Sequence, residues 1–230
     1  MEKLVYLLGD TPKGSVPAGR KDLREALLGI APELSALGAR GVSFAVADVD
    51  DPDVGRVDQM NASGLLDAHL SIWVDQLDER AGLEELIFPL AERVAGYLVT
   101  ESILRDYAKR DWAPGSPSPG IALVTTFPKP DTLDHGTFYA RWHDSHGPLS
   151  LELHPLTRYV RNAVFRPITE GAPPLHAIVS ESVASCGVAA DIDQFYGGRE
   201  NRRRVVKDLL SFVEIESLST VVMRETLMET

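Results

Sequence analysis

Apolar residues recur in the same order of patterns in the first and the second half of the chain. Each half opens with a short apolar run, continues with apolar residues every three or four positions, and then shows two runs of strand length, a second helical segment and a final run. The strand-like runs of the first half lie at 4–8, 41–46, 68–74 and 97–104. Those of the second half lie at 121–126, 159–165, 176–180 and 221–228. The spacing of apolar residues in these segments predicts the order strand, helix, strand, strand, helix, strand in each half.

This order is that of the ferredoxin-like βαββαβ unit, in which two helices cover one face of an antiparallel sheet. The other face of each sheet is left bare, and its apolar side chains must be hidden. Two such sheets in one chain can cover each other and enclose a barrel or a cleft. We therefore predict an α+β protein with two ferredoxin-like repeats whose antiparallel sheets pack into a barrel-like core. Pairing of halves from two chains, as a homodimer, stays open.

A segment rich in proline, glycine and serine separates the two halves. Between Trp112 and Gly120 the chain reads Ala-Pro-Gly-Ser-Pro-Ser-Pro, a composition typical of linkers. We expect one repeat over residues 1–112, a linker over 113–119 and a second repeat over 120–230.

Charge and composition narrow the class of protein. The chain has 23 Lys plus Arg against 34 Asp plus Glu, a formal net charge of −11, which argues against a nucleic-acid partner. Its one cysteine, Cys186, cannot form an internal disulfide, and no run of 18 apolar residues suggests a membrane span. We expect a soluble, cytoplasmic protein with no nucleic-acid or membrane partner.

The candidate chemistry lies in the second half, which holds five of the six histidines. Phe138, Trp142 and His146 are four residues apart, so a helix would place them on one face, with an aromatic wall ending in an imidazole. Pro148 disfavours helical geometry at Gly147, which predicts a helix end or a kink at His146.

A histidine at this place can give or take a proton near neutral pH. We predict His146 as the catalytic residue, with His143 beside it. Tyr139 shares a neighbouring face with His143, and three further side chains lie near strand starts. The predicted substrate-binding residues are Phe138, Tyr139, Trp142, Tyr159, Arg161 and His176.

The run Phe138, Trp142, His146, Gly147, Pro148, Leu149 resembles the signature of the EthD family, a branch of the dimeric α+β barrel proteins. The resemblance covers residues 120–228 and includes the ending around Arg224-Glu225-Thr226. The first half lacks the His-Gly-Pro motif, and we interpret it as a degenerate copy that completes the barrel. The family name is tied to an accessory role in ether degradation. Related barrels include cofactor-free monooxygenases, lactone isomerases and polyketide cyclases or decarboxylases, which share a cleft for a small apolar molecule.

The resemblance implies a cofactor-independent enzyme, an oxidoreductase or a lyase or isomerase, acting on a small hydrophobic or aromatic compound by proton transfer to or from histidine. Three alternatives stay open: a non-catalytic carrier or accessory protein of an oxygenase system, a structural or interaction module, and a haem or metal enzyme. We expect no metal site, because His143 and His146 have neither a third convergent ligand nor a known metal-binding spacing. The basic run Arg202-Arg203-Arg204 is interpreted as a solvated helix face.

Overall fold

The computed structural model describes residues 1–10, 20–60 and 64–228 and confirms the predicted order of elements in both halves. The first half contains β1 (Glu2–Gly9), α1 (Arg20–Ala36), β2 (Gly41–Val46), β3 (Ala68–Val74), α2 (Ala81–Ile87) and β4 (Arg93–Arg105). The second half contains β5 (Ile121–Phe127), a long helix in three parts, β6 (Arg158–Pro167), β7 (Ala177–Val183), α5 (Cys186–Ala190), α6 (Ile192–Tyr196), α7 (Arg199–Leu209) and β8 (Ser219–Leu227). The three parts are α3 (His135–Tyr139), a π-helix (Ala140–His146) and α4 (Gly147–Leu153).

The eight strands form one closed antiparallel barrel in the order β1-β3-β2-β8-β5-β7-β6-β4. Each half contributes four consecutive strands of this order, which is the strand arrangement of a ferredoxin-like sheet. The two sheets join where β2 pairs with β8 and where β4 pairs with β6. The barrel therefore closes within one chain, and a second copy is not needed to complete it.

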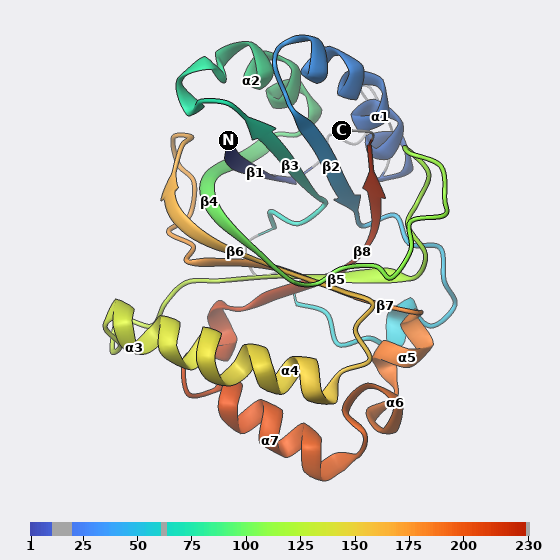
Figure 1. Ribbon diagram of the computed structural model, residues 1–230, viewed down its shortest axis with the longest axis vertical. Helices are drawn as coiled ribbons and strands as arrows, with labels where there is room; N and C mark the ends of the chain where they lie inside the picture. Colours follow the sequence, from blue (N-terminus) through green and yellow to red (C-terminus); the bar gives the residue numbers. More distant parts are fainter. Residues whose placement is uncertain (11–19, 61–63, 229–230) are drawn as a thin grey trace.

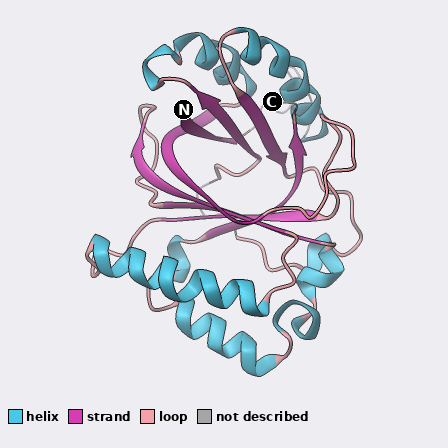
Figure 2. Ribbon diagram, in the orientation of Figure 1, coloured by secondary structure: helices cyan, strands magenta, loops and turns pink. Residues whose placement is uncertain are grey.

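Helices cover the two outer sides of this barrel (Figures 1 and 2). The helices α1 and α2 pack on the sheet of the first half, and α3 to α7 pack on the sheet of the second half. Because successive strand residues point to opposite faces, Ile121 and Leu123 of β5 pack toward the helices, whereas Ala122 and Val124 point into the barrel. Apolar side chains from both sheets fill the barrel interior, including Val5, Leu7, Ile178 and Met223.

One part of the barrel interior is charged. The Lys3 ammonium lies 2.6 Å from Glu101 Oε1, and Arg158 Nη1 lies 2.6 Å from Glu225 Oε1. The Tyr107 hydroxyl also donates to Glu225, at 2.9 Å. Each buried charge is thus paired with an opposite one, as burial in a low-dielectric interior requires.

Residues 113–119 run beside β8 between the two halves. The Gly115 amide donates to the Leu227 carbonyl and the Ser118 amide donates to the Glu225 carbonyl, so this segment is tied to the barrel. The division of the chain into units 1–112 and 120–230 stays a prediction. No described helix has the length and apolar character needed to cross a membrane.

Candidate functional site

The helix that carries the predicted motif does not end at His146, which corrects the first of the two expectations, a helix end or a kink. The helix continues from α3 through the π-helix into α4, and the Gly147 amide donates to the Trp142 carbonyl five residues earlier. Proline lacks an amide hydrogen and crowds the preceding turn, and the wider π turn before Pro148 lets the helix pass through it. His146 therefore lies within a widened turn, and π turns of this kind are frequent at functional sites.

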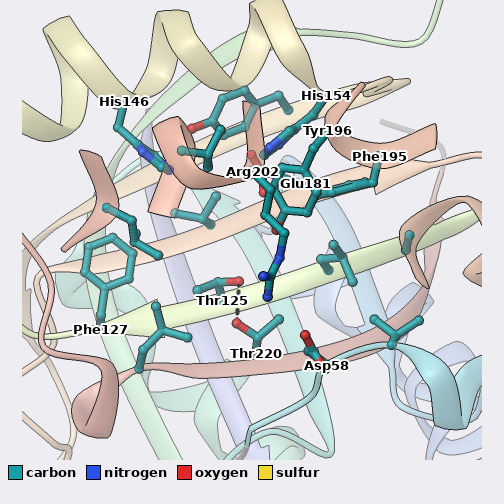
Figure 3. Close-up of a pocket in the computed structure, with 18 of the residues that line it drawn as sticks. Asp58, Thr125, Phe127, His146, His154, Glu181, Phe195, Tyr196, Arg202 and Thr220 are labelled. Atoms are coloured by element: carbon teal, nitrogen blue, oxygen red, sulfur yellow. Dashed lines mark hydrogen bonds between the residues drawn. The ribbon is translucent and has the colours of Figure 1, made fainter. Parts of the chain in front are cut away.

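A cavity of about 310 Å³ lies between the outer face of the second sheet and its covering helices (Figure 3). Aromatic rings form much of its wall: Phe127, Trp142, Tyr159, Phe195, Tyr196 and Phe212. Its size falls at the lower end of the range for small-molecule sites. From the sequence we expected the two sheets to enclose a barrel or a cleft. They form a barrel whose interior is largely filled by side chains, and the cavity lies on the helix side of the second sheet.

A second hollow, of about 360 Å³, opens at one end of the barrel and is lined by residues such as Trp73, Glu101 and Arg158. Its acidic and basic groups already bind each other, since Glu101 pairs with Lys3 and Arg158 with Glu225. The helix-side cavity, by contrast, contains polar groups, such as the ring nitrogens of His154, that have no partner among the described residues. It is therefore the better candidate for a ligand site.

His146 projects into this cavity as half of a histidine–aspartate pair. Its Nδ1 lies 2.9 Å from Asp208 Oδ2, on α7, and its ring meets the Phe212 ring edge-on at 5.1 Å. The Ser145 hydroxyl donates to the other carboxylate oxygen of Asp208, at 2.5 Å. Two neighbouring residues of the π-helix thus hold Asp208, and Asp208 in turn fixes the orientation of the imidazole.

The protonation of His146 follows from its surroundings. Burial lowers the pKa of His146, while the hydrogen bond and the negative charge of Asp208 act in the opposite direction without cancelling it. The ring is therefore mainly neutral at pH 7. Because a carboxylate only accepts hydrogen bonds, the single ring proton belongs on Nδ1, and the Nε2 lone pair is free to accept a proton.

Two further titratable groups line the same cavity. Burial raises the pKa of Glu181, on β7, to about 7. His154 stacks on Phe195 with ring centroids 4.3 Å apart, and burial lowers its pKa to about 4. Both ring nitrogens of His154 are buried without a hydrogen-bond partner.

Of the eight site residues predicted from the sequence, three line the cavity: His146, Trp142 and Tyr159. Phe138 is fully buried directly behind them, with its ring 5.8 Å from that of Trp142. Tyr139 is half-buried and stacks on Trp142 at 6.1 Å, outside the cavity wall.

The remaining three predicted residues lie elsewhere. His143 packs against the Trp142 ring at 4.6 Å but does not line the cavity. Arg161 lies over the same indole, with its guanidinium carbon 5.8 Å from the ring centre. His176 accepts a hydrogen bond from the Lys129 amide at Nδ1 and packs against His135. These three side chains support the aromatic wall or the neighbouring loop.

Asp208, His154 and Glu181 were not predicted as site residues from the sequence, and Arg202 was interpreted as part of a solvated helix face. Glu181 had a detectable signal: it lies between Val179 and Val183, at the core-facing positions of a strand with period two. Arg202 is exposed, as interpreted, but its side chain also reaches the cavity, where Arg56 and Asp58 of the first half lie as well.

Among the described residues, no group of three or more His, Cys, Asp or Glu side chains is arranged to hold a metal ion. A haem iron requires an imidazole nitrogen that is free to bind it. The Nε2 of His146 faces the cavity, but a single histidine does not establish an axial ligand, so the haem alternative stays open.

Comparisons with known proteins concern the fold. No model of a protein family matches the sequence, and no curated protein is significantly similar to it. The structure is similar to that of an anthrone oxidase-like protein, with a TM-score of 0.58 and 16% identity over 100% of this chain and 93% of the other. A candidate monooxygenase from Lactobacillus acidophilus NCFM gives a TM-score of 0.51 and 11% identity over 99% and 95% of the two chains. A mutant chlorite dismutase from Candidatus Nitrospira defluvii, in complex with cyanide, gives 0.50 and 9% over 98% and 90%. Identities this low establish the fold alone: the chain has the dimeric α+β barrel fold, with both ferredoxin-like repeats in one polypeptide.

Proposed function

We propose that the protein is an enzyme that acts on a small hydrophobic, aromatic compound by proton transfer to His146, without a cofactor of its own. The observation that carries this proposal is the neutral His146–Asp208 pair, which faces an aromatic cavity with Nε2 unengaged. A neutral imidazole whose Nδ1–H is held by a carboxylate is a general base, because the carboxylate stabilises the imidazolium that forms. The resemblance to the EthD family, which also stays a proposal, agrees with a small apolar substrate.

The aromatic wall limits the chemistry that this base can serve. It suits a flat substrate with a weakly acidic C–H or O–H group, such as an aromatic ketone or a phenol, whose anion is spread over its rings. An anthrone is one such compound, and one structural neighbour is anthrone oxidase-like. His146 Nε2 would take a proton from the CH₂ group that links the two outer rings. The resulting enolate would be oxidised by dioxygen, so that one anthrone and one dioxygen give one anthraquinone and one water.

Anthrone itself is therefore the first test substrate. With the full chain in air-saturated buffer, we expect anthraquinone to form with matching dioxygen uptake. His146→Ala should lower kcat by about 10²–10⁴-fold, which is the usual contribution of a general base. Its circular dichroism spectrum should match that of the wild type, because the ring lies on a cavity wall.

His135→Ala is the matched control, since His135 is exposed and lies outside the cavity. His143→Ala tests the other histidine predicted as catalytic; because its ring does not line the cavity, we expect less than about a tenfold loss of activity. Equal turnover by His146→Ala and the wild type would refute the proposal. Binding of anthrone without turnover would favour a ligand-binding or accessory protein, and a Soret absorbance band in the purified protein would favour a haem enzyme.

A further inference from the structure

The cavity has a second group of polar side chains, apart from the His146–Asp208 pair. Figure 3 shows Glu181, His154 and Tyr196 grouped on one side of the cavity, with His146 and Phe127 on the other. Glu181 projects from β7 of the sheet, and His154 follows the last turn of α4. These residues come from elements other than α7, which supplies Asp208, so they are positioned independently of it.

His154 is buried at this place without satisfying its hydrogen-bonding groups. Its exposed fraction is 6%, and neither ring nitrogen has a partner in the described structure. A neutral imidazole always carries one donor and one acceptor, and a buried polar group without a partner is destabilising. Its two ring faces are engaged, because Phe195 stacks on it and Tyr196 meets it edge-on at 5.2 Å. The ring is therefore held in place, and its two nitrogens have no partner among the described residues.

The Glu181 side chain likewise has no hydrogen-bond partner among the described residues. Its carboxyl group lines the cavity beside the aromatic side chains of Tyr159 and Tyr196, and no hydrogen bond or ion pair to it is seen among the described residues. Burial raises the pKa of Glu181 to about 7 and lowers that of His154 to about 4. At neutral pH this end of the cavity thus holds a neutral imidazole and a carboxyl group that is protonated in a large part of the molecules.

Uncharged donors and acceptors of this kind match an uncharged oxygen better than a carboxylate or an ammonium group. Directly beside Glu181 and His154, a carboxylate would be repelled by the ionised form of Glu181, and an ammonium group would meet only a partly ionised carboxyl group. The permanent charges of the cavity are those of Arg56, Asp58 and Arg202. A carbonyl oxygen can accept from the Glu181 carboxyl or from a His154 N–H, and a phenolic hydroxyl can both donate and accept.

We propose that Glu181 and His154 bind an uncharged carbonyl or phenolic oxygen at the end of the ligand that faces away from His146. The substrate class is then an aromatic ketone or phenol with two functional ends: an acidic hydrogen at His146 and an oxygen at Glu181 and His154. This inference rests on the proposed function, because it assumes that the reacting hydrogen faces His146. In anthrone the carbonyl lies across the central ring from the CH₂ group, so one orientation satisfies both ends.

The same contact would assist the reaction. When the CH₂ group loses its proton, negative charge develops on the carbonyl oxygen, and a hydrogen bond from the Glu181 carboxyl becomes stronger as that charge grows. No proton needs to leave Glu181 for this effect, and the proton from carbon goes to His146 Nε2.

A matched pair of probes isolates this contact: anthrone and 9,10-dihydroanthracene, which has the same ring system without the carbonyl oxygen. Binding to the full chain is measured under nitrogen by quenching of tryptophan fluorescence, so that no turnover occurs. We expect the wild type to bind anthrone about tenfold more tightly, which corresponds to one or two buried hydrogen bonds. Glu181→Leu and His154→Leu should each reduce this preference, and the double variant should abolish it.

Two controls separate this contact from a general loss of packing. Glu181→Gln keeps a donor at the same place and should retain most of the preference. His135→Leu makes the same kind of change outside the cavity and should retain all of it. A wild type with no preference for the carbonyl, or leucine variants with the full preference, would overturn the inference. Such a result would leave the His146 proposal standing, because that proposal is judged by the turnover of His146→Ala.

Discussion

Two opposing influences set the chemistry of the His146 side chain. The apolar surroundings disfavour the imidazolium and lower its pKa, whereas Asp208 favours the imidazolium through a hydrogen bond and a negative charge. The base must be neutral to accept a proton. The value of kcat/KM should therefore rise as the pH increases through the lowered pKa of His146, below 6.5. It should fall again above about pH 7 as the Glu181 carboxyl, which donates to the substrate oxygen, ionises.

Asp208→Asn tests this balance. The substitution removes the charge that stabilises the imidazolium, so the pKa of His146 should fall further and the acid limb of the profile should move to lower pH. In this variant His146 would be a weaker base, and its ring could carry the proton on Nε2 instead of Nδ1. We therefore expect kcat to fall by about 10²-fold or more. The measurement is the pH dependence of kcat/KM for both proteins with anthrone. An acid limb at the same pH in both would show that Asp208 does not act through His146.

At the scale of elements, the π-helix, which carries Trp142 and His146 of the predicted motif, is bonded to α7 and to the turn after it. Ser145 and His146 both bind the Asp208 carboxylate, and Arg141 Nη1 donates to the Ser211 carbonyl just beyond α7. Three residues of the π-helix therefore hold α7, which supplies the Asp208 carboxylate, and the turn that follows it. A change that weakens the packing of the π-helix against α7 should therefore also make the orientation of the His146 ring less fixed.

Ser145→Ala measures this coupling. Without the Ser145 hydroxyl, Asp208 keeps only its bond to His146, so the free energy of unfolding should fall by about 0.5–1.5 kcal/mol. A less firmly held Asp208 should also lower kcat about three- to tenfold. Urea unfolding and steady-state kinetics provide the two readings, and Ser211→Ala serves as a control because that side chain does not line the cavity. A Ser145→Ala protein with unchanged kcat would show that the hydroxyl matters for stability only.

The helices and strands could be predicted from the sequence, because apolar residues recur at regular spacings in most of them. The predicted strands at 41–46 and 68–74 coincide with β2 and β3. A helix end or a kink was predicted at His146. The helix end was wrong, because a widened turn is a backbone adjustment that the spacing of side chains does not reveal. The pairing of His146 with Asp208 was equally hidden, since 62 residues separate them and only the packing of α7 brings them together.

At the scale of the whole molecule, the sequence predicted that two sheets would face each other, but not which side of them would stay hollow. The interior between the sheets is filled because both contribute large side chains at lumen positions, such as Leu7, Tyr97 and Met223. The second sheet has a hollow on its helix side, where Thr125, Glu181 and Thr220 line the cavity. Whether a space stays hollow depends on the volumes of the side chains that face each other across it. Which side chains face each other depends on the strand register, and the spacing of apolar residues in the sequence does not determine the register.

The buried interior also makes the stability of the fold dependent on pH. His69 is buried in the barrel, and burial lowers its pKa to about 3, with the charges of Lys3 and Arg158 acting in the same direction. Below pH 6.5 the unfolded chain takes up a proton at this residue while the folded chain does not. The free energy of unfolding should therefore fall as the pH drops from 6.5, by about 2–3 kcal/mol at pH 4.5 from this residue.

His69→Gln removes the titration. Whatever its stability at pH 7, the variant should lose about 2–3 kcal/mol less than the wild type between pH 7 and pH 4.5, as measured by urea unfolding at both values. Other titrating groups contribute equally to both proteins, so the difference in slope belongs to His69. Parallel losses in the two proteins would show that this histidine takes up its proton without unfolding.

The homodimer suggested by the sequence stays a prediction that light scattering can check, and barrel closure no longer depends on it. The two repeats contribute different parts of the cavity. The reactive side chains come from the second repeat, whereas Arg56, Val57 and Asp58 reach the same cavity from a connecting loop of the first. Connecting loops tolerate substitution far better than packed elements. Substitutions at Arg56, Val57 and Asp58 should therefore change which compounds enter the cavity while leaving the His146–Asp208 pair intact.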